Sequence, residues 1–116
     1  MNTSEVLTRA ADLIEQRGHT KRRHVTVTGC LCVAGAMFAA VGMEPDHKHF
    51  DSEFWPGYTP DRADLVKVAY DWFRDWLDRM GVDCRDPVDW NDAKKRTKEE
   101  VVTTLRGAAE AARAEQ

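Results

Sequence analysis

The residues best suited to covalent chemistry are a cysteine and the histidines that are spread along the chain. Cys32 stands at the beginning of an apolar stretch that we expect to be helical, and a helix N-terminus can lower the pKa of a thiol. A histidine together with Asn91 and Asp92 would complete a nucleophilic site. The alternative is a small buried side chain, because Leu31 and Val33 flank the thiol. The sequence favours a protein that is not an enzyme, and a small thiol-dependent hydrolase using Cys32 is the alternative.

Two groups of side chains are of the kinds that bind metals. His47 and His49 lie close together in a polar segment, and Cys30, Cys32 and Cys84 offer three thiols. Zinc is commonly held by two separate pairs of nitrogen or sulfur ligands, and the second pair is missing here. In a helix, successive side chains also point about 100° apart, which separates Cys30 from Cys32. The sequence therefore predicts no metal and no cofactor, with His47 and His49 as the remaining metal candidates.

Aromatic side chains alternate with acids in the segment 43–59. They are Phe50, Phe54, Trp55 and Tyr58. Large aromatic residues are typical anchors of protein interfaces, and burial of one ring stabilises a complex by about 2 kcal/mol. The neighbouring acids would select a basic partner. The alternative, which stays open, is that the segment folds back and its aromatic residues cover the core.

A row of aspartates follows on the next expected helix, opposite its apolar side. Asp71, Asp75 and Asp78 belong to this row, which in the simplest case is a solvated helix face. Together with the aromatic segment, they form the surface that we expect to contact a protein partner. Dimerisation through Trp72 or Trp76 is also compatible with the pattern.

The charge of the chain is distributed unevenly. Its 116 residues carry a net charge of −3, with 42% hydrophobic and 32% charged residues, which excludes a disordered or disulfide-rich class. Two basic clusters, 21–24 and 94–98, could hold phosphate groups if they met in space. However, the segment 43–92 contains 6 Lys or Arg and 13 acids. This excess of acids should repel nucleic acid, so it argues against nucleic acid as a partner.

These residues must be positioned by helices. Apolar residues at helical spacing predict helices over about 3–17, 30–41, 60–80 and 97–113, with a further short turn over 86–90. The uncharged second helix is too short for a membrane span, so it should form the centre of the core. We predict an all-α, single-domain bundle of about four helices with two long connections, covering residues 1–116. Three cysteines and no signal peptide favour the cytoplasm and no membrane.

A polar motif precedes the last helix, and we interpret it as structural. Trp90 can anchor the connection on the core, while Asn91 and Asp92 can bond the backbone around the turn into the last helix. Arg96 is expected to pair with Asp92, four residues earlier. Thr97 begins a capping box whose fourth residue is a glutamate.

Three local patterns stand out along the chain: Val6-Leu-x-x-Ala-Ala-x-Leu-Ile14, Cys32-Val-Ala-Gly-Ala36 and Trp90-Asn-Asp-x-x-x-Arg-Thr-x-x-Glu-Val-Val102. Together they resemble a family of short uncharacterised proteins from actinobacteria and their phages. The chain departs from the family pattern at Lys95, where a glycine is usual, and over 43–59. The resemblance implies a helical fold and supplies no activity. It is consistent with a small phage or bacterial accessory protein that binds a host protein in the host cytoplasm.

Overall fold

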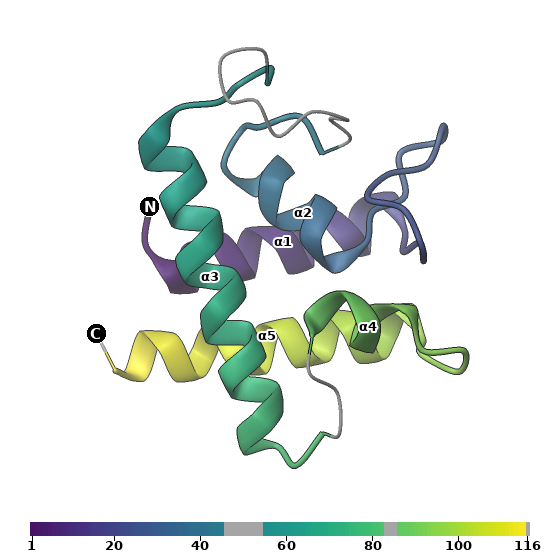
Figure 1. Ribbon diagram of the computed structural model, residues 1–116. Coiled ribbons are helices and arrows are strands. Elements are labelled where there is room, and N and C mark those ends of the chain that lie inside the picture. Colours follow the sequence, from purple (N-terminus) through teal and green to yellow (C-terminus); the bar gives the residue numbers. More distant parts are fainter. Residues whose placement is uncertain (46–54, 83–85, 116) are drawn as a thin grey trace.

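The computed structural model describes residues 1–45, 55–82 and 86–115, and helices dominate these residues. This confirms the predicted all-α class. The helices, shown in Figure 1, are α1 (Thr3–Arg17), α2 (Val33–Ala40), α3 (Pro60–Arg79), α4 (Pro87–Asp92) and α5 (Lys98–Ala114). The short turn expected over 86–90 is the helix α4. No helix in the described part of the chain is long and apolar enough to cross a membrane.

Local signals in the sequence set the beginnings of the longer helices. Thr97 accepts a hydrogen bond from the Glu100 N–H, and the Glu100 side chain bonds back to the Thr97 N–H, as the capping box predicted. Thr59 caps α3 in front of a proline at its first position. Asn2 forms a second capping box with Glu5, so it is the cap of α1. Such caps each stabilise a helix by about 1 kcal/mol.

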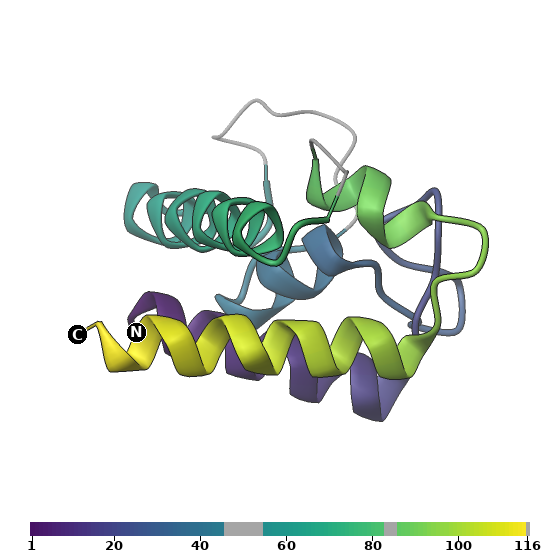
Figure 2. The same ribbon diagram turned by 90° about the horizontal axis from the view of Figure 1, so that it is seen from below.

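The helices form two layers. Figures 1 and 2 show α1 and α5 lying side by side and antiparallel, with both chain termini at the same end. The helix α3 crosses this pair at a steep angle, and α2 and α4 lie beside it in the same upper layer. The Ser4 hydroxyl donates to the Ala109 carbonyl, and the Trp72 indole N–H donates to the Ala108 carbonyl. These two bonds join α1 and α3 to the same turn of α5.

The apolar helix α2 lies in the centre, as its composition predicted, but it is shorter than expected. It contacts α1, α3 and α4, and most of its residues are buried. The expected start at Cys30 is wrong, because the backbone there bonds to the preceding segment instead. Leu31 donates its N–H to the Gly18 carbonyl, and its own carbonyl accepts from Thr20. The chain is therefore extended up to Cys32, which is the cap of α2.

The spacing of apolar residues on α3 predicts a buried stripe, and the structure buries or half-buries six of its eight members. The stripe consists of Leu65, Val68, Ala69, Trp72, Phe73, Trp76, Leu77 and Met80. Val68 and Met80 belonged to that stripe, yet they are 55% and 61% exposed. Val66 is 6% exposed and packs in the core in their place. The reason is that α3 is covered by α2 and α4 as well as by α1 and α5, so its apolar contacts are not confined to one face.

Asn91 joins three parts of the upper layer through one completely buried amide. Its oxygen accepts from the Val33 N–H at 3.0 Å, at the first turn of α2, and bonds to the His19 ring at 2.9 Å. Its nitrogen donates to the Thr20 carbonyl and to Asp92. The amide orientation is set by the nitrogen, which donates to the Thr20 carbonyl, so the atom facing His19 is the oxygen, which can only accept. The His19 Nε2 must therefore carry the proton in this bond. The predicted role of Asn91 at the turn into the last helix is therefore corrected: it binds the segment 18–32.

Asp92 and Lys21 add further bonds between α4 and the segment 18–32. Asp92 accepts from the Arg22 N–H at 2.9 Å, and Lys21 donates to the carbonyls of Ala93 and Lys94 beyond the end of α4. Lys21 thereby binds the connection that leads from α4 to α5, in which the Ala93 carbonyl also accepts the Arg96 N–H. Arg22 is in the left-handed region, with φ of 66°.

The expected pair between Arg96 and Asp92 is absent from the structure. The Arg96 guanidinium instead donates to the Trp90 carbonyl and to Glu100, and it stacks over the Trp90 ring at 4.5 Å. Trp90 is 2% exposed and packs edge to face on Phe73. The tryptophan thus anchors α4 on the core, and Arg96 covers it from the solvent side.

The backbone of α2 approaches the segment 18–32 so closely that Gly35 has no room for a side chain. A Cβ atom on Gly35 would lie 2.1 Å from the His24 carbonyl oxygen. The same oxygen accepts a hydrogen bond from the Cys32 N–H at 3.1 Å. Glycine is required here by packing, since Gly35 lies inside a regular helix.

We predict that Asn91→Ala destabilises the protein by about 3 kcal/mol. The substitution leaves the Val33 N–H and the Thr20 carbonyl without partners, and an unsatisfied buried group costs about 1–3 kcal/mol. Urea unfolding measures the change, and Asp89→Ala on the exposed side of α4 is the matched control, expected within about 0.5 kcal/mol of wild type. Equal losses in the two variants would contradict the role of the amide.

We also predict that stability falls between pH 7 and pH 5 because of His19. Burial lowers the pKa of His19 below its usual value of 6.5, and Lys21 acts in the same direction, against the opposing effects of Asn91 and Asp92. Below pH 6.5 the unfolded chain therefore takes up a proton at His19 that the folded protein does not. Melting temperatures across this range should flatten in His19→Gln and keep their slope in His24→Gln. A slope unchanged by His19→Gln would contradict the prediction.

Candidate functional site

Cys32 has a structural position in the fold. It is 2% exposed, and its sulfur accepts the Gly35 N–H at 3.3 Å as the cap of α2. Burial raises the pKa of this thiol, so the nucleophilic thiolate is disfavoured. No histidine ring of the described residues bonds to the sulfur: His19 bonds to Asn91, and the His24 ring packs on Phe38. The structure brings Asn91 and a histidine together without a nucleophile between them.

The predicted metal candidates are not tested by the structure. His47, His49 and Cys84 lie outside the described residues. Within residues 1–45, 55–82 and 86–115, no three histidine, cysteine or acidic side chains are grouped as metal ligands. Cys30 and Cys32 are free thiols.

The aromatic segment contributes at least one residue to the core. Trp55 is 7% exposed, packs on the Phe38 ring at 4.8 Å, and donates its indole N–H to the Glu44 carbonyl. This corrects the assignment of Trp55 to a partner-binding surface, because its ring is already covered within the protein. Tyr58 is half-buried against the same core, and Phe50 and Phe54 lie outside the described residues.

The predicted acidic row lies on α3. Asp75 and Asp78 are exposed and Asp71 is half-buried. Arg74 contacts Asp71 at 3.5 Å and Asp75 at 3.9 Å. Exposed pairs of this kind contribute between about 0 and 1 kcal/mol, so a partner's basic side chains could replace Arg74 at little cost. Trp72 and Trp76, considered above for a dimer, are half-buried against the core.

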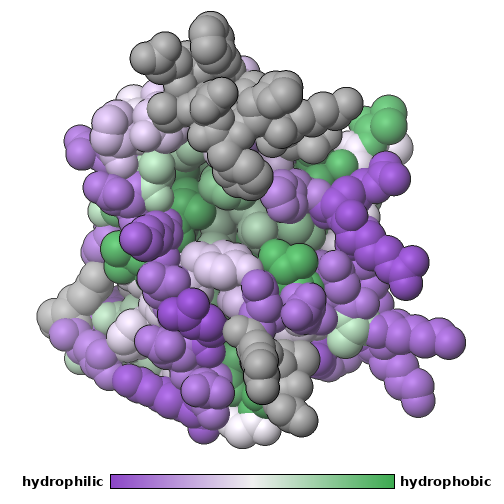
Figure 3. Space-filling model, viewed as in Figure 1, coloured by the Kyte–Doolittle hydropathy of each residue, from purple (hydrophilic) through white to green (hydrophobic). Residues whose placement is uncertain are grey.

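An apolar groove lies between α2, α3 and α4. Its volume is about 360 Å³, and its lining consists of His24, Ala34, Phe38, Ala63, Val66, Lys67, Tyr70, Asp71 and Val88. Figure 3 shows apolar atoms gathered over α2 and the adjoining part of α3. Six of the nine lining side chains are apolar or aromatic without charge, and Lys67 and Asp71 are the charged members. We call this feature the apolar groove.

The walls of the apolar groove are fixed by bonds behind them. The Tyr70 hydroxyl donates to Asp86, which also caps α4 by accepting the Val88 N–H at 2.8 Å. Burial and this carboxylate raise the pKa of Tyr70, so the hydroxyl keeps its proton and remains the donor. The Asp86 carboxylate therefore links α3 to α4 beside the groove. The apolar groove was not predicted from the sequence. The available signal was the pair of small residues Ala34 and Ala63, which lie on facing helices.

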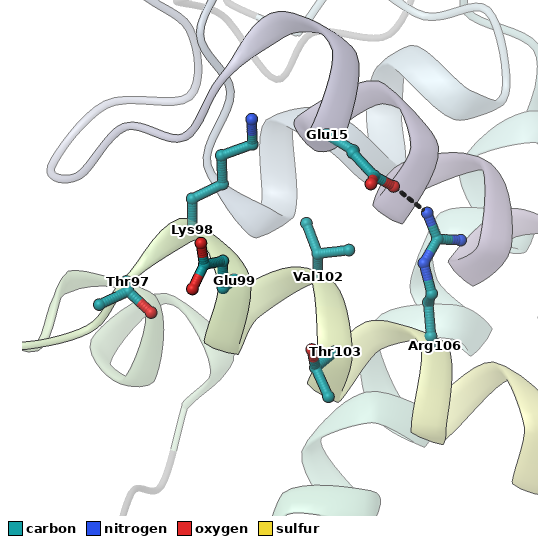
Figure 4. A pocket seen from close by; sticks show the side chains of 7 residues that line it. All are labelled: Glu15, Thr97, Lys98, Glu99, Val102, Thr103 and Arg106. Atoms are coloured by element: carbon teal, nitrogen blue, oxygen red, sulfur yellow. Dashed lines mark hydrogen bonds and ion pairs between the residues drawn. The ribbon is translucent and has the colours of Figure 1, made fainter.

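A second hollow lies between the end of α1 and the beginning of α5, with a volume of about 610 Å³. Figure 4 shows that its side chains are mostly polar and that Arg106 is joined to Glu15. Arg106 also bonds to Asp12 at 2.9 Å, and these carboxylates raise the pKa of the guanidinium. Its cation is thus already paired within the protein. This hollow has a structural explanation, as the site of an ion-pair network between α1 and α5.

The comparisons with known proteins agree with the resemblance at the level of the family. Neither the search of curated proteins nor that of solved structures found a match. A family model described as a family of unknown function, DUF6197, matches residues 1–111. This match covers nearly the whole chain. The chain therefore belongs to the family of unknown function DUF6197.

Proposed function

We propose that this chain is an accessory protein that acts by binding another protein through the apolar groove and the acidic side of α3. The observation that carries the proposal is the groove itself, because its lining is mainly apolar and it borders on acidic residues of the same helix. Its volume of about 360 Å³ is at the small end of the range of about 300–1,000 Å³ seen for ligand pockets. This is room for side chains of a partner.

The charges beside the groove define the chemistry of the partner. Lys67 and Asp71 line the groove with one charge of each sign. The acids Asp75 and Asp78 follow Asp71 at positions four and seven residues later, which lie on one side of a helix. A partner segment that inserts an apolar side chain would therefore place its neighbouring residues against carboxylates. The proposed occupant is a peptide segment with an apolar residue flanked by Lys or Arg.

The resemblance to small actinobacterial and actinophage proteins suggests that this partner is a host protein. The free thiols Cys30 and Cys32 suit a reducing compartment, so we place the interaction in the cytoplasm. The thiol-dependent hydrolase is the weaker function, because the thiol at Cys32 is buried and has a raised pKa.

We predict that peptides selected from a random display library on the wild-type protein contain an apolar residue next to Lys or Arg. Ala63→Phe should fill the groove and weaken the best peptide by about 30-fold, which corresponds to the loss of one buried apolar side chain at about 2 kcal/mol. The double variant Asp71→Asn with Asp75→Asn should also bind the peptide more weakly than wild type. This loss of affinity should grow as the salt concentration is lowered, because attraction between exposed charges is strongest at low salt. Isothermal titration calorimetry measures these affinities.

The matched control variants make the same kinds of substitution at positions outside the apolar groove. Ala111→Phe adds the same ring at a half-exposed position of α5, and Glu110→Gln removes an exposed acid from that helix. Both should bind the selected peptides as the wild type does, and all variants should keep their helical circular dichroism. Peptides that bind Ala63→Phe as tightly as wild type, or that lack basic residues, would contradict the proposal.

A further inference from the structure

The fold brings together two basic clusters that are about 70 residues apart in the sequence. Lys21 donates to the Ala93 carbonyl at 2.7 Å and to the Lys94 carbonyl at 3.0 Å, and the Arg22 N–H donates to Asp92. The segment 20–22 therefore lies directly against residues 92–94. The juxtaposition is fixed from inside by the buried Asn91 amide, so it does not depend on the flexible ends of the basic side chains.

Five cations in these clusters are exposed and lack an ion pair with any residue of the described ranges. They are Arg22, Arg23, Lys94, Lys95 and Lys98, and we call them the basic end. Arg96 is excluded because it pairs with Glu100. The segments 17–24 and 92–100 together contain eight Lys or Arg and three acids, a net charge of +5 in a chain of −3. Strong positive charge is thus concentrated here.

Asp86, the cap of α4, and Asp89 and Asp92 within that helix lie beside the basic end, but the aspartate row that contributed most to the argument against nucleic acid lies elsewhere in the fold. The helix α3, which carries the aspartate row, is on the left of Figure 1, and the two basic segments form the loops on the right. Figure 3 shows long hydrophilic side chains projecting from that right edge. The molecule extends 38 × 33 × 25 Å, whereas salt screens exposed charges over about 8 Å at physiological ionic strength. The repulsion from α3 is therefore largely screened at the basic end.

We propose that the basic end binds the phosphate backbone of a nucleic acid. Arginine can bind a phosphate with two parallel hydrogen bonds, and lysine acts as a mobile point charge, so the five side chains can neutralise several phosphates in a row. Two helices reach this end, and neither offers a basic recognition face: α4 has six residues and buries Trp90 and Asn91, and the exposed first turn of α5 carries acids next to Lys98. Binding is through the backbone and is independent of base sequence. It is separate from the apolar groove.

A membrane surface fits the basic end less well. Basic segments that lie on membranes combine their charge with a broad apolar face. On the described parts of the two basic segments and the loop between them, Val27 is the single large apolar side chain that is exposed. One valine supplies little apolar area, whereas backbone binding to nucleic acid needs cations alone.

The experiment is fluorescence anisotropy with a labelled 20-base-pair DNA duplex of mixed sequence. If five phosphates are neutralised, the logarithm of the affinity should fall with the logarithm of the salt concentration with a slope of about −4.5, which is about 500-fold between 50 and 200 mM. A duplex of unrelated sequence should bind with similar affinity.

The variants are designed to keep the fold. Arg22→Asn with Arg23→Gln retains a residue that tolerates the left-handed backbone at position 22, and Lys94→Gln with Lys95→Gln changes exposed side chains. Each pair should reduce the salt slope by about 1.8 and weaken binding at least about tenfold at 50 mM salt. Arg9→Gln with Arg113→Gln removes two exposed cations outside the basic end and should leave both values unchanged.

Three results would overturn the proposal. The first is no complex with the duplex at 50 mM salt, where electrostatic binding is strongest. The second is an equal loss in the control pair, which would assign any binding to overall charge. The third is binding to vesicles of phosphatidylcholine and phosphatidylserine, lost in the basic-end variants, without binding to DNA, which would assign the surface to membranes.

Discussion

The arrangement of the upper layer depends on one buried carboxamide. Asn91 is the point at which α4, the first turn of α2 and the segment 18–32 are joined, and its amide oxygen and nitrogen are both used. Two surfaces follow from this junction. His24 and Val88 both line the apolar groove, and they belong to the two parts of the chain, 18–32 and α4, that the amide joins. The basic end exists because the same amide seats the segment 18–32 on α4.

Local signals predicted the elements of the fold that depend on neighbouring residues. The caps at Thr59 and Thr97 fixed where α3 and α5 begin, since a cap involves only the next three residues. The beginning of α2 was wrong because Leu31 bonds to Gly18 and Thr20, thirteen and eleven residues away. The buried face of α3 was predicted except at Val68 and Met80, which are exposed, and at Val66, which is buried. The partners of α3 are helices from distant parts of the chain, and a single sequence contains no signal for their positions.

The sites show the same division between local and distant information. The motif at Trp90 was recognised as structural, but its partners were assigned to the following turn, whereas they lie in the segment before α2. The two basic clusters were visible in the sequence, and only the fold shows that they meet. The apolar groove is formed by four separate parts of the chain. The small residues Ala34 and Ala63 were a signal in the sequence, but only the fold shows that they face each other. For Trp55 the residue type alone was ambiguous, because a tryptophan suits a core position as well as an interface, and the structure shows that its ring is buried.

The close approach at Gly35 has a consequence for how sequences of this kind can change. A single oxygen atom, the carbonyl of His24, accepts the Cys32 N–H and occupies the space of a side chain at position 35. The two positions are therefore coupled through an atom that belongs to neither of them. A related chain whose backbone at position 24 lies farther from α2 could replace both Cys32 and Gly35. Replacing the glycine alone would displace the His24 carbonyl and break its hydrogen bond with the Cys32 N–H. If relatives share the Cys-x-x-Gly pair, the close packing of the backbone at these positions explains it without a reactive thiol.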